Sequence, residues 1–389
     1  MWDVDGNEYI EYGMGLRAVT LGHAWPSVVS SARQAMEGGA NFTRPAEIEV
    51  RCAEAFLQIV PAAEMVKFTK DGSSATSAAV KLSRAHTGRD LVGICGNHPF
   101  FSSDDWFMGT TALDAGIPQA IKDLTVKFDY NDPASVEALF GKYPGQIACL
   151  IMEPCKSDPP QDDFLHQTQE LCRQHGTLFI LDEMITGFRM HNGGAQQLYG
   201  ITPDLSTWGK GLANGFALSA LAGKREFMEL GGLRTDQPRV FLLSTTHGAE
   251  THALAAAIES MRIYRDEPVV ETLHAQGEKL LNGWRDVTAA HDLGEYVPVF
   301  GFPSNLVFGA RDAEGQPSQG YRTLLLQELI RRGVLAPSLV ISYSHRDVDI
   351  KQTIDALDGA LQIYKRALTD GFEKHLVGPP SKVVYRKFN

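Results

Sequence analysis

An aspartate and a lysine, each at the end of an apolar segment, are the residues of this chain best suited to chemistry. Leu178-Phe-Ile-Leu181 leads to Asp182, and Trp208-Gly-Lys-Gly211 places Lys210 between two glycines. A lysine amine can bond covalently to a carbonyl carbon, and a fixed carboxylate can keep a ring nitrogen protonated. The glycines leave space for a flat ring beside the backbone. These demands are those of pyridoxal phosphate, so we expect Asp182 and Lys210 to be catalytic residues that bind this cofactor.

Two other interpretations of Asp182 and Lys210 compete with cofactor binding. An apolar strand that ends in Asp-Glu also presents a magnesium ligand in nucleotide hydrolases, but those enzymes need a phosphate loop with Gly-Lys followed by Ser or Thr. None of the chain's three Gly-Lys pairs continues in that way: Gly141-Lys142, Gly209-Lys210 and Gly223-Lys224. Alternatively, Asp182 caps a turn and Lys210 is a solvated loop lysine, an interpretation that the surrounding motifs argue against.

A glycine followed by hydroxyl residues predicts a phosphate site. Gly72-Ser-Ser-Ala-Thr76 leads into a segment whose apolar residues are spaced for one face of a helix. Free backbone N–H groups, hydroxyls and the positive end of the helix dipole attract a phosphate. A plain serine N-cap explains the same residues as well. The segment Ser244-Thr-Thr-His-Gly248 is likewise either a second phosphate contact or an ordinary turn.

Composition limits the partners and the compartment. The 389 residues include 36 Lys and Arg and 47 Asp and Glu, for a formal charge of −11, which argues against nucleic acid or an anionic membrane as partner. No apolar segment is long enough to span a bilayer, and residues 1–6 do not resemble a signal peptide. An odd number of scattered cysteines without a C-x-x-C pair suggests reduced thiols, not zinc ligands: Cys52, Cys95, Cys149, Cys155 and Cys172. We therefore expect a cytoplasmic protein.

Short apolar runs alternate with helical stretches, which predicts an α/β fold with a mostly parallel sheet. Residues 91–95, 146–152 and 177–181 read as buried strands, and 162–175 as a helix that ends at Gly176. From about residue 266 the chain changes to long charged helices with few strands. We expect an N-terminal segment over 1–35 that packs with the small domain, a large cofactor-binding domain over 36–265, and a smaller α+β domain over 266–389.

The chain resembles the class III pyridoxal-phosphate-dependent aminotransferases of fold type I, and most closely the group around glutamate-1-semialdehyde 2,1-aminomutase. The similarity runs from Trp2 to about Tyr364. It rests on eight segments: Trp2-Asp-Val-Asp-Gly6, Leu21-Gly-His-Ala24, Gly72-Ser-Ser-Ala-Thr76, Met152-Glu-Pro154, Leu181-Asp-Glu183, Thr186-Gly-Phe-Arg189, Gly209-Lys-Gly211 and Leu335-Ala-Pro-Ser338. Such a series is specific for the superfamily and much less specific for the substrate.

The resemblance implies roles for residues that the first motifs do not settle. Lys210 matches the lysine that binds the cofactor covalently, and Asp182 matches the partner of the ring nitrogen. Met184 falls where a hydrophobic residue supports the underside of the ring. Gly72, Ser73 and Ser74 match the phosphate loop, although family members usually have glutamate at the position of Ser74.

Two further matches concern the partner subunit and the face of the ring. Thr245 matches a threonine that reaches the phosphate in the neighbouring subunit, which implies a homodimer with shared sites. Family members usually stack a tyrosine on the ring, and His98 takes that place here, with Phe100 as a rival.

Two departures from the aminomutases concern the substrate. The mutases bind the substrate carboxylate partly through an arginine in an N-terminal segment that this sequence does not contain, and they carry a glutamate-bearing insert where this chain passes from Ser338 to Leu339. The resemblance therefore implies an aminotransferase that moves an amino group, by family habit from glutamate, to an aldehyde or ketone of a polar metabolite, for example a sugar such as an oxo-deoxy-octulosonate. The alternatives are the aminomutase itself and a non-catalytic protein that binds the cofactor or has a regulatory role.

Overall fold

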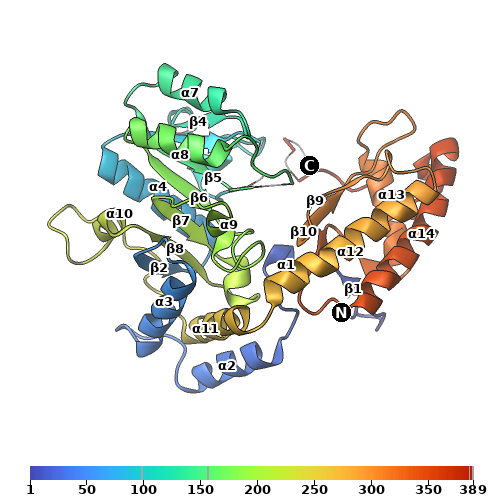
Figure 1. Ribbon diagram of the computed structural model, residues 1–389, viewed down its shortest axis with the longest axis horizontal. Coiled ribbons are helices and arrows are strands. Elements are labelled where there is room, and N and C mark those ends of the chain that lie inside the picture. The colour runs from blue at the N-terminus through green and yellow to red at the C-terminus, as the bar shows by residue number, and fades with distance from the viewer. Residues whose placement is uncertain (98–99, 156, 385, 388–389) are drawn as a thin grey trace. The chain divides into compact units, whose positions relative to one another are not determined.

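The computed structural model describes residues 1–97, 100–155, 157–384 and 386–387, and the chain divides into two compact units. One unit comprises Met1–Gly22 together with Pro268–Val384, and the other contains His23–Glu267. Figure 1 shows the elements of each unit. Among the residues described, no helix combines the length and the apolar character needed to cross a bilayer.

A seven-stranded sheet forms the centre of the larger unit. Its strands lie in the order β2 (Met65–Thr69), β8 (Ser219–Gly223), β7 (Leu205–Trp208), β6 (Leu178–Asp182), β5 (Ile147–Met152), β3 (Leu91–Cys95) and β4 (Thr125–Phe128). Among these described strands, β8 runs opposite to the rest: it is antiparallel to both β2 and β7, and the other paired strands are parallel. The predicted α/β fold with a mostly parallel sheet is therefore confirmed.

The apolar runs of the sequence became the central strands. The runs 91–95, 146–152 and 177–181 correspond to β3, β5 and β6, and every residue of β5 and β6 is buried. The predicted helix over 162–175 is α8 (Phe164–Gln174), and Gly176 follows it with φ +59°. A glycine is suited to that left-handed conformation, which ends the helix.

Helices cover both faces of the sheet. Alternate residues of one strand point to opposite faces, so Cys149 and Ile151 join the core beneath α4 (Gly72–Thr87), whereas Leu150 and Met152 join the core beneath α7 (Pro133–Lys142) and α8. The longer helix α11 (Thr251–Asp266) packs against α2 (Pro26–Glu37) and α3 (Glu47–Ile59). Short helices complete the unit: α5 (Asp105–Met108), α6 (Gln119–Lys122), α9 (Gly194–Leu198) and α10 (Arg225–Met228).

The smaller unit combines three longer helices with short strands. The helices are α12 (Val269–Ala290), α13 (Gln319–Ile330) and α14 (Asp347–Asp370). A three-stranded antiparallel sheet has the order β12 (Leu339–Val340), β10 (Asn305–Phe308) and β9 (Val299–Phe302). The N-terminal strand β1 (Ile10–Glu11) pairs in parallel with β11 (Val334–Leu335), next to the one-turn helix α1 (Met14–Arg17).

The units divide at different residues from those drawn on the sequence. The first boundary lies after Gly22 and the second after Glu267, whereas the sequence analysis drew them after residues 35 and 265. The first difference has a physical reason, because α2 packs against α11 and so belongs to the larger unit. An amphipathic helix such as α2 has to bury its apolar face, and α2 does so against α11.

Gly277 allows α12 to approach the chain at Pro303, and we expect its replacement to destabilise the protein. A Cβ atom at Gly277 would lie 1.9 Å from the carbonyl oxygen of Pro303, which is backbone and cannot move aside cheaply. Gly277→Ala should lower the free energy of unfolding by about 1–3 kcal/mol, the usual cost of overpacking. Urea titration of the purified chain measures this loss.

Gly141→Ala is the matched control, because Gly141 is also helical but has nothing within 4 Å of the position that a Cβ would take. Alanine there should raise stability by up to about 1 kcal/mol through helix propensity. Equal effects of the two substitutions would contradict the close approach at Gly277.

Candidate active site

Asp182 and Lys210 lie at the same edge of the sheet. Asp182 is the last residue of β6 and pairs in register with Thr207 of β7, and Lys210 follows the end of β7 at Trp208. Because β6 and β7 are parallel, their carboxyl ends meet at one edge, which is where open α/β sheets bind ligands. The structure thus brings the two predicted catalytic residues to the carboxyl ends of neighbouring strands.

Asp182 is a buried carboxylate with one oxygen still available. Its side chain is 2% exposed, and Oδ1 accepts hydrogen bonds from the Met184 N–H at 3.1 Å and the Thr207 hydroxyl at 2.9 Å. Both of these bonds are made to Oδ1, and no described residue donates a hydrogen bond to Oδ2. Oδ2 can therefore accept a hydrogen bond from a bound group. Burial raises the pKa of Asp182 to about 6, and the positive charge of Lys210 opposes that rise.

Lys210 adopts a backbone conformation that lysine seldom takes. Its φ is +46°, and it begins a short 3₁₀ turn over Lys210–Ala213. Strain of this kind costs about 1–3 kcal/mol and persists only where the surroundings enforce it. The Tyr264 hydroxyl of α11 donates to the Gly211 carbonyl at 2.7 Å, and the preceding Trp208 is fully buried. The packing therefore fixes the direction in which the lysine leaves the chain.

Met184 connects the lysine turn with the start of α4. A Cβ atom added at Gly209 would lie 2.7 Å from Met184 Sδ, and one added at Gly72 would lie 3.1 Å from the same sulfur. The two glycines therefore let the backbone approach Met184 from both sides. Four of the predicted site residues, Gly72, Asp182, Met184 and Lys210, gather around this edge.

Asp71, not a serine, caps the amino end of α4. Asp71 Oδ1 accepts the Ser74 N–H at 2.8 Å, and Asp71 Oδ2 accepts the Ser74 hydroxyl at 3.1 Å. Both donors of Ser74 are thus engaged within the loop. Within the described part of the chain, the N–H groups of Gly72 and Ser73 have no acceptor, so this 16-residue helix offers two free donors to an anion.

The segment around Thr245 is fastened to the chain just after β2. The Lys70 N–H donates to Ser244 Oγ at 3.3 Å, and the Lys70 ammonium pairs with the Glu250 carboxylate. Gly248 packs so closely that an added Cβ would lie 3.0 Å from the Phe68 carbonyl oxygen. The exposed Thr245 therefore lies on a loop that contacts of the same chain hold near the residue before the cap of α4.

Of the two candidates for stacking on the ring, the structure describes only Phe100. His98 lies outside the described residues. Phe100 is 48% exposed and meets Phe107 edge to face, with 5.6 Å between the ring centroids. Its exposed ring leaves Phe100 a candidate for contact with a bound group.

The sequence analysis missed a supporting residue, Glu183. It is fully buried, and its carboxylate accepts the N–H groups of Ala195 at 2.9 Å and Gln196 at 2.7 Å, together with the Thr186 hydroxyl. Burial raises the pKa of Glu183 to about 7. These bonds hold the turn that follows Asp182. The signal in the sequence was the polar Thr186 three residues beyond an Asp-Glu pair.

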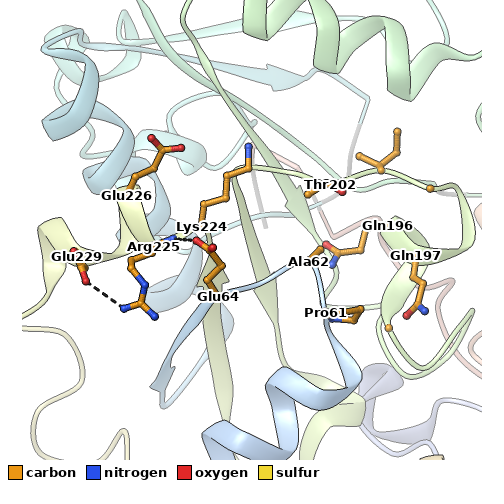
Figure 2. A pocket seen from close by; sticks show the side chains of 13 residues that line it. Pro61, Ala62, Glu64, Gln196, Gln197, Thr202, Lys224, Arg225, Glu226 and Glu229 are labelled. Carbon is orange, nitrogen blue, oxygen red and sulfur yellow. Dashed lines mark hydrogen bonds and ion pairs between the residues drawn. The ribbon is translucent and has the colours of Figure 1, made fainter.

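A separate hollow lies at the opposite edge of the sheet (Figure 2). Its volume is about 990 Å³, and its walls include Glu64 before β2, Thr202 before β7 and Lys224 after β8. Charged groups there already have partners in the same wall: the Arg225 N–H donates to Glu64 at 2.7 Å, and its guanidinium pairs with Glu229 at 3.2 Å. The hollow is therefore not part of the site at Lys210.

Comparisons with known proteins identify the family of this chain. A family model described as aminotransferase class-III matches residues 1–306. Glutamate-1-semialdehyde 2,1-aminomutase 1 of Lachnoclostridium phytofermentans is 31% identical over 93% of this chain and 89% of the relative. The glutamate-1-semialdehyde 2,1-aminomutase of Alkaliphilus oremlandii is 33% identical over 92% of this chain and 88% of the relative.

Solved structures show the same fold. The FumI protein of Sphingopyxis sp. MTA144, determined with pyridoxal phosphate, has a TM-score of 0.85 and 28% identity, covering 95% of this chain and 87% of its own. An omega-transaminase from Sphaerobacter thermophilus has a TM-score of 0.85 and 25% identity, covering 94% and 89%. The matched family, the relatives above 30% identity and the shared fold lead to one conclusion: this chain belongs to the class III aminotransferases, enzymes of fold type I that depend on pyridoxal phosphate.

Proposed function

We propose that this enzyme transfers an amino group from glutamate to an aldehyde or ketone of a polar metabolite, with Lys210 and Asp182 as its catalytic residues. The observation that supports it best is the meeting of Lys210 and the buried Asp182 at the carboxyl ends of two neighbouring parallel strands. A nucleophilic amine beside a fixed negative charge suits the chemistry of the family's cofactor.

The residues at this edge fit pyridoxal phosphate. Gly72 and Gly209 let the backbone pack directly against Met184, the residue that would support the ring, and Asp182 Oδ2 is available to a protonated ring nitrogen. The N–H groups of Gly72 and Ser73 at the start of α4 suit a phosphate. Ser74 stays a predicted contact, although Asp71 engages its N–H and hydroxyl.

Each side chain has a distinct task in this proposal. When bound, pyridoxal phosphate supplies an aldehyde and a ring that withdraws electrons. Lys210 would hold the cofactor covalently, and its amine, when free, would act as the base that accepts a proton from the substrate carbon and returns it at the cofactor carbon. Asp182 keeps a negative charge at a dry position, where such a charge acts most strongly on a nearby cation. Met184 supports the ring from one side.

The connection between β11 and β12 favours transfer between molecules over a mutase reaction. Only residues 336–338 separate Leu335 of β11 from Leu339 of β12. This short connection leaves no room for the glutamate-bearing insert of the mutases. A mutase must retain its intermediate, whereas an aminotransferase must release one product before the second substrate enters. The aminomutase remains the second candidate because the relatives above carry that name.

Experiments must identify the amino acceptor and test the alternative of a non-catalytic protein. Sugar aldehydes and ketones, such as an oxo-deoxy-octulosonate, belong in a screen of acceptors together with other polar carbonyl compounds. A protein that only binds the cofactor would not need both Lys210 and Asp182 in this arrangement. The five cysteines are all buried, and none of them forms a disulfide, in keeping with the cytoplasmic location that we infer.

We also infer a homodimer in which Thr245 serves the partner's site. The segment around Thr245 is exposed, and large apolar side chains nearby in the chain are exposed as well, with Leu242 at 70% and Leu233 at 86%. Exposed apolar surface of this kind is typical of protein interfaces. The ion pair of Lys70 with Glu250 would hold the loop in position for the partner.

Complementation between two inactive variants tests the shared site. In a mixed dimer of Thr245→Ala and Lys210→Ala, one site would carry both lesions and the other would be intact. We expect activity at limiting cofactor to return as subunits exchange, measured by coupled assay with exchange followed by native mass spectrometry. Exchange without any gain over Thr245→Ala alone would mean that each site is built from one subunit.

Turnover with single substrates tests the proposed reaction. Glutamate alone should release 2-oxoglutarate from the holoenzyme in an amount stoichiometric with bound cofactor, because an aminotransferase completes half of its cycle without an acceptor. The variant Lys210→Ala should bind the cofactor but release no 2-oxoglutarate, since it lacks the amine that carries the proton. Mass spectrometry measures the amount of 2-oxoglutarate that each protein releases. Rapid isomerisation of glutamate-1-semialdehyde to 5-aminolevulinate without a donor would instead establish the aminomutase.

A further inference from the structure

A segment after β3 is fastened along the first two turns of α4. The Thr76 hydroxyl donates to the Phe101 carbonyl at 2.9 Å. At the next residue of the helix, the Ser77 hydroxyl lies 3.1 Å from Ser102 Oγ and donates to Asp104 Oδ2. These bonds join residues 25 to 27 positions apart in the chain, so they fix where residues 101–104 lie on the helix.

The hydroxyl of Ser77 is the centre of this clamp, which we define as Ser77, Ser102, Asp104 and Trp106. The Trp106 Nε1–H donates to Ser77 Oγ at 2.8 Å, and the Asp104 N–H donates to Ser102 Oγ at 3.1 Å. A carboxylate only accepts, so Ser77 must give its proton to Asp104. Ser102 then gives its own proton to Ser77. One assignment of protons satisfies every group in the clamp, which makes it a rigid support.

The clamp holds the backbone that contacts Ser73. Ser103 lies between two clamp residues, and its N–H donates to Ser73 Oγ at 3.0 Å. That bond occupies one lone pair of the Ser73 oxygen and leaves the hydroxyl proton to be donated elsewhere. Ser73 is the second residue of α4, so its hydroxyl lies near the backbone N–H groups of Gly72 and Ser73, for which the described residues provide no acceptor. The hydroxyl proton can therefore join them in binding an anion.

We propose that Ser77 and Asp104 are positioning residues for the phosphate of the cofactor. They hold the Ser103 N–H against Ser73, so that the Ser73 hydroxyl keeps its proton directed at the phosphate oxygens. This inference rests on the proposed role of Ser73 in phosphate binding. It adds two residues that would not touch the cofactor and that the sequence motif does not include.

Binding of pyridoxal phosphate and of pyridoxal, which lacks the phosphate, separates this role from a general effect on folding. Both affinities are measured by fluorescence titration of the full chain after cofactor removal. Ser77→Ala and Asp104→Asn should each weaken pyridoxal phosphate binding about threefold to tenfold, the size expected for a misdirected hydrogen bond to a charged group. Binding of pyridoxal should change by less than about twofold, because its ring contacts remain.

A double-mutant cycle and a matched serine complete the test. If Ser77 acts through Ser73, then Ser73→Ala combined with Ser77→Ala should lose no more affinity for pyridoxal phosphate than Ser73→Ala alone. Ser83 is the control, since it lies on the same helix and its hydroxyl donates to the Ala79 carbonyl of that helix at 2.9 Å. Ser83→Ala should leave the ratio of the two affinities unchanged.

The outcomes distinguish this inference from the function on which it rests. A changed ratio for Ser73→Ala with unchanged ratios for Ser77→Ala and Asp104→Asn would overturn the positioning role and leave the phosphate contact intact. An unchanged ratio for Ser73→Ala would overturn the phosphate contact itself. Equal loss of both ligands in Ser77→Ala, together with a lower melting temperature, would show that the clamp only stabilises the fold.

Discussion

A carboxylate buried at the edge of a parallel sheet is the constraint on which the rest of this site depends. Asp182 is 2% exposed, and its burial favours the neutral acid, so its pKa rises to about 6. The two hydrogen bonds to Oδ1 offset only part of this cost. A cation beside Oδ2 would offset the remainder. The fold therefore holds a negative charge that is better accommodated once a protonated ring lies against it.

The surrounding elements can be understood as the means of placing that ring. The parallel pairing of β6 and β7 sets Lys210 near Asp182, and the packing of Tyr264 on Gly211 holds the lysine at φ +46°. Gly72 and Gly209 let the backbone pack directly against Met184. Strand order thus brings lysine and carboxylate together, and the glycines fix Met184 beside them.

Much of the fold was predictable because its signals are local. The runs that became β3, β5 and β6 are apolar throughout, and strands covered on both faces must be so. Asp182 was recognisable because it ends such a strand, and Lys210 because it lies between two glycines just after Trp208. Other features depend on contacts between distant residues. The bond from Ser103 to Ser73, the antiparallel direction of β8 and the packing of α2 on α11 have no local pattern. The helix cap was expected to be a serine, and only the folded structure shows that Asp71 takes this place.

The pH dependence of the stability gained from cofactor binding tests the central claim about Asp182 most directly. Because the folded pKa of this acid is raised from 3.8 to about 6, its contribution to apoenzyme stability is present below about pH 4 and is lost as the pH rises through about 6. A ring cation should restore that loss. The rise in melting temperature on adding pyridoxal phosphate should therefore grow between about pH 4 and 6 and level off above that range. Asp182→Asn keeps every other titrating group and should lack this growth. An identical pH profile in the variant would show that the Asp182 charge does not hold the cofactor.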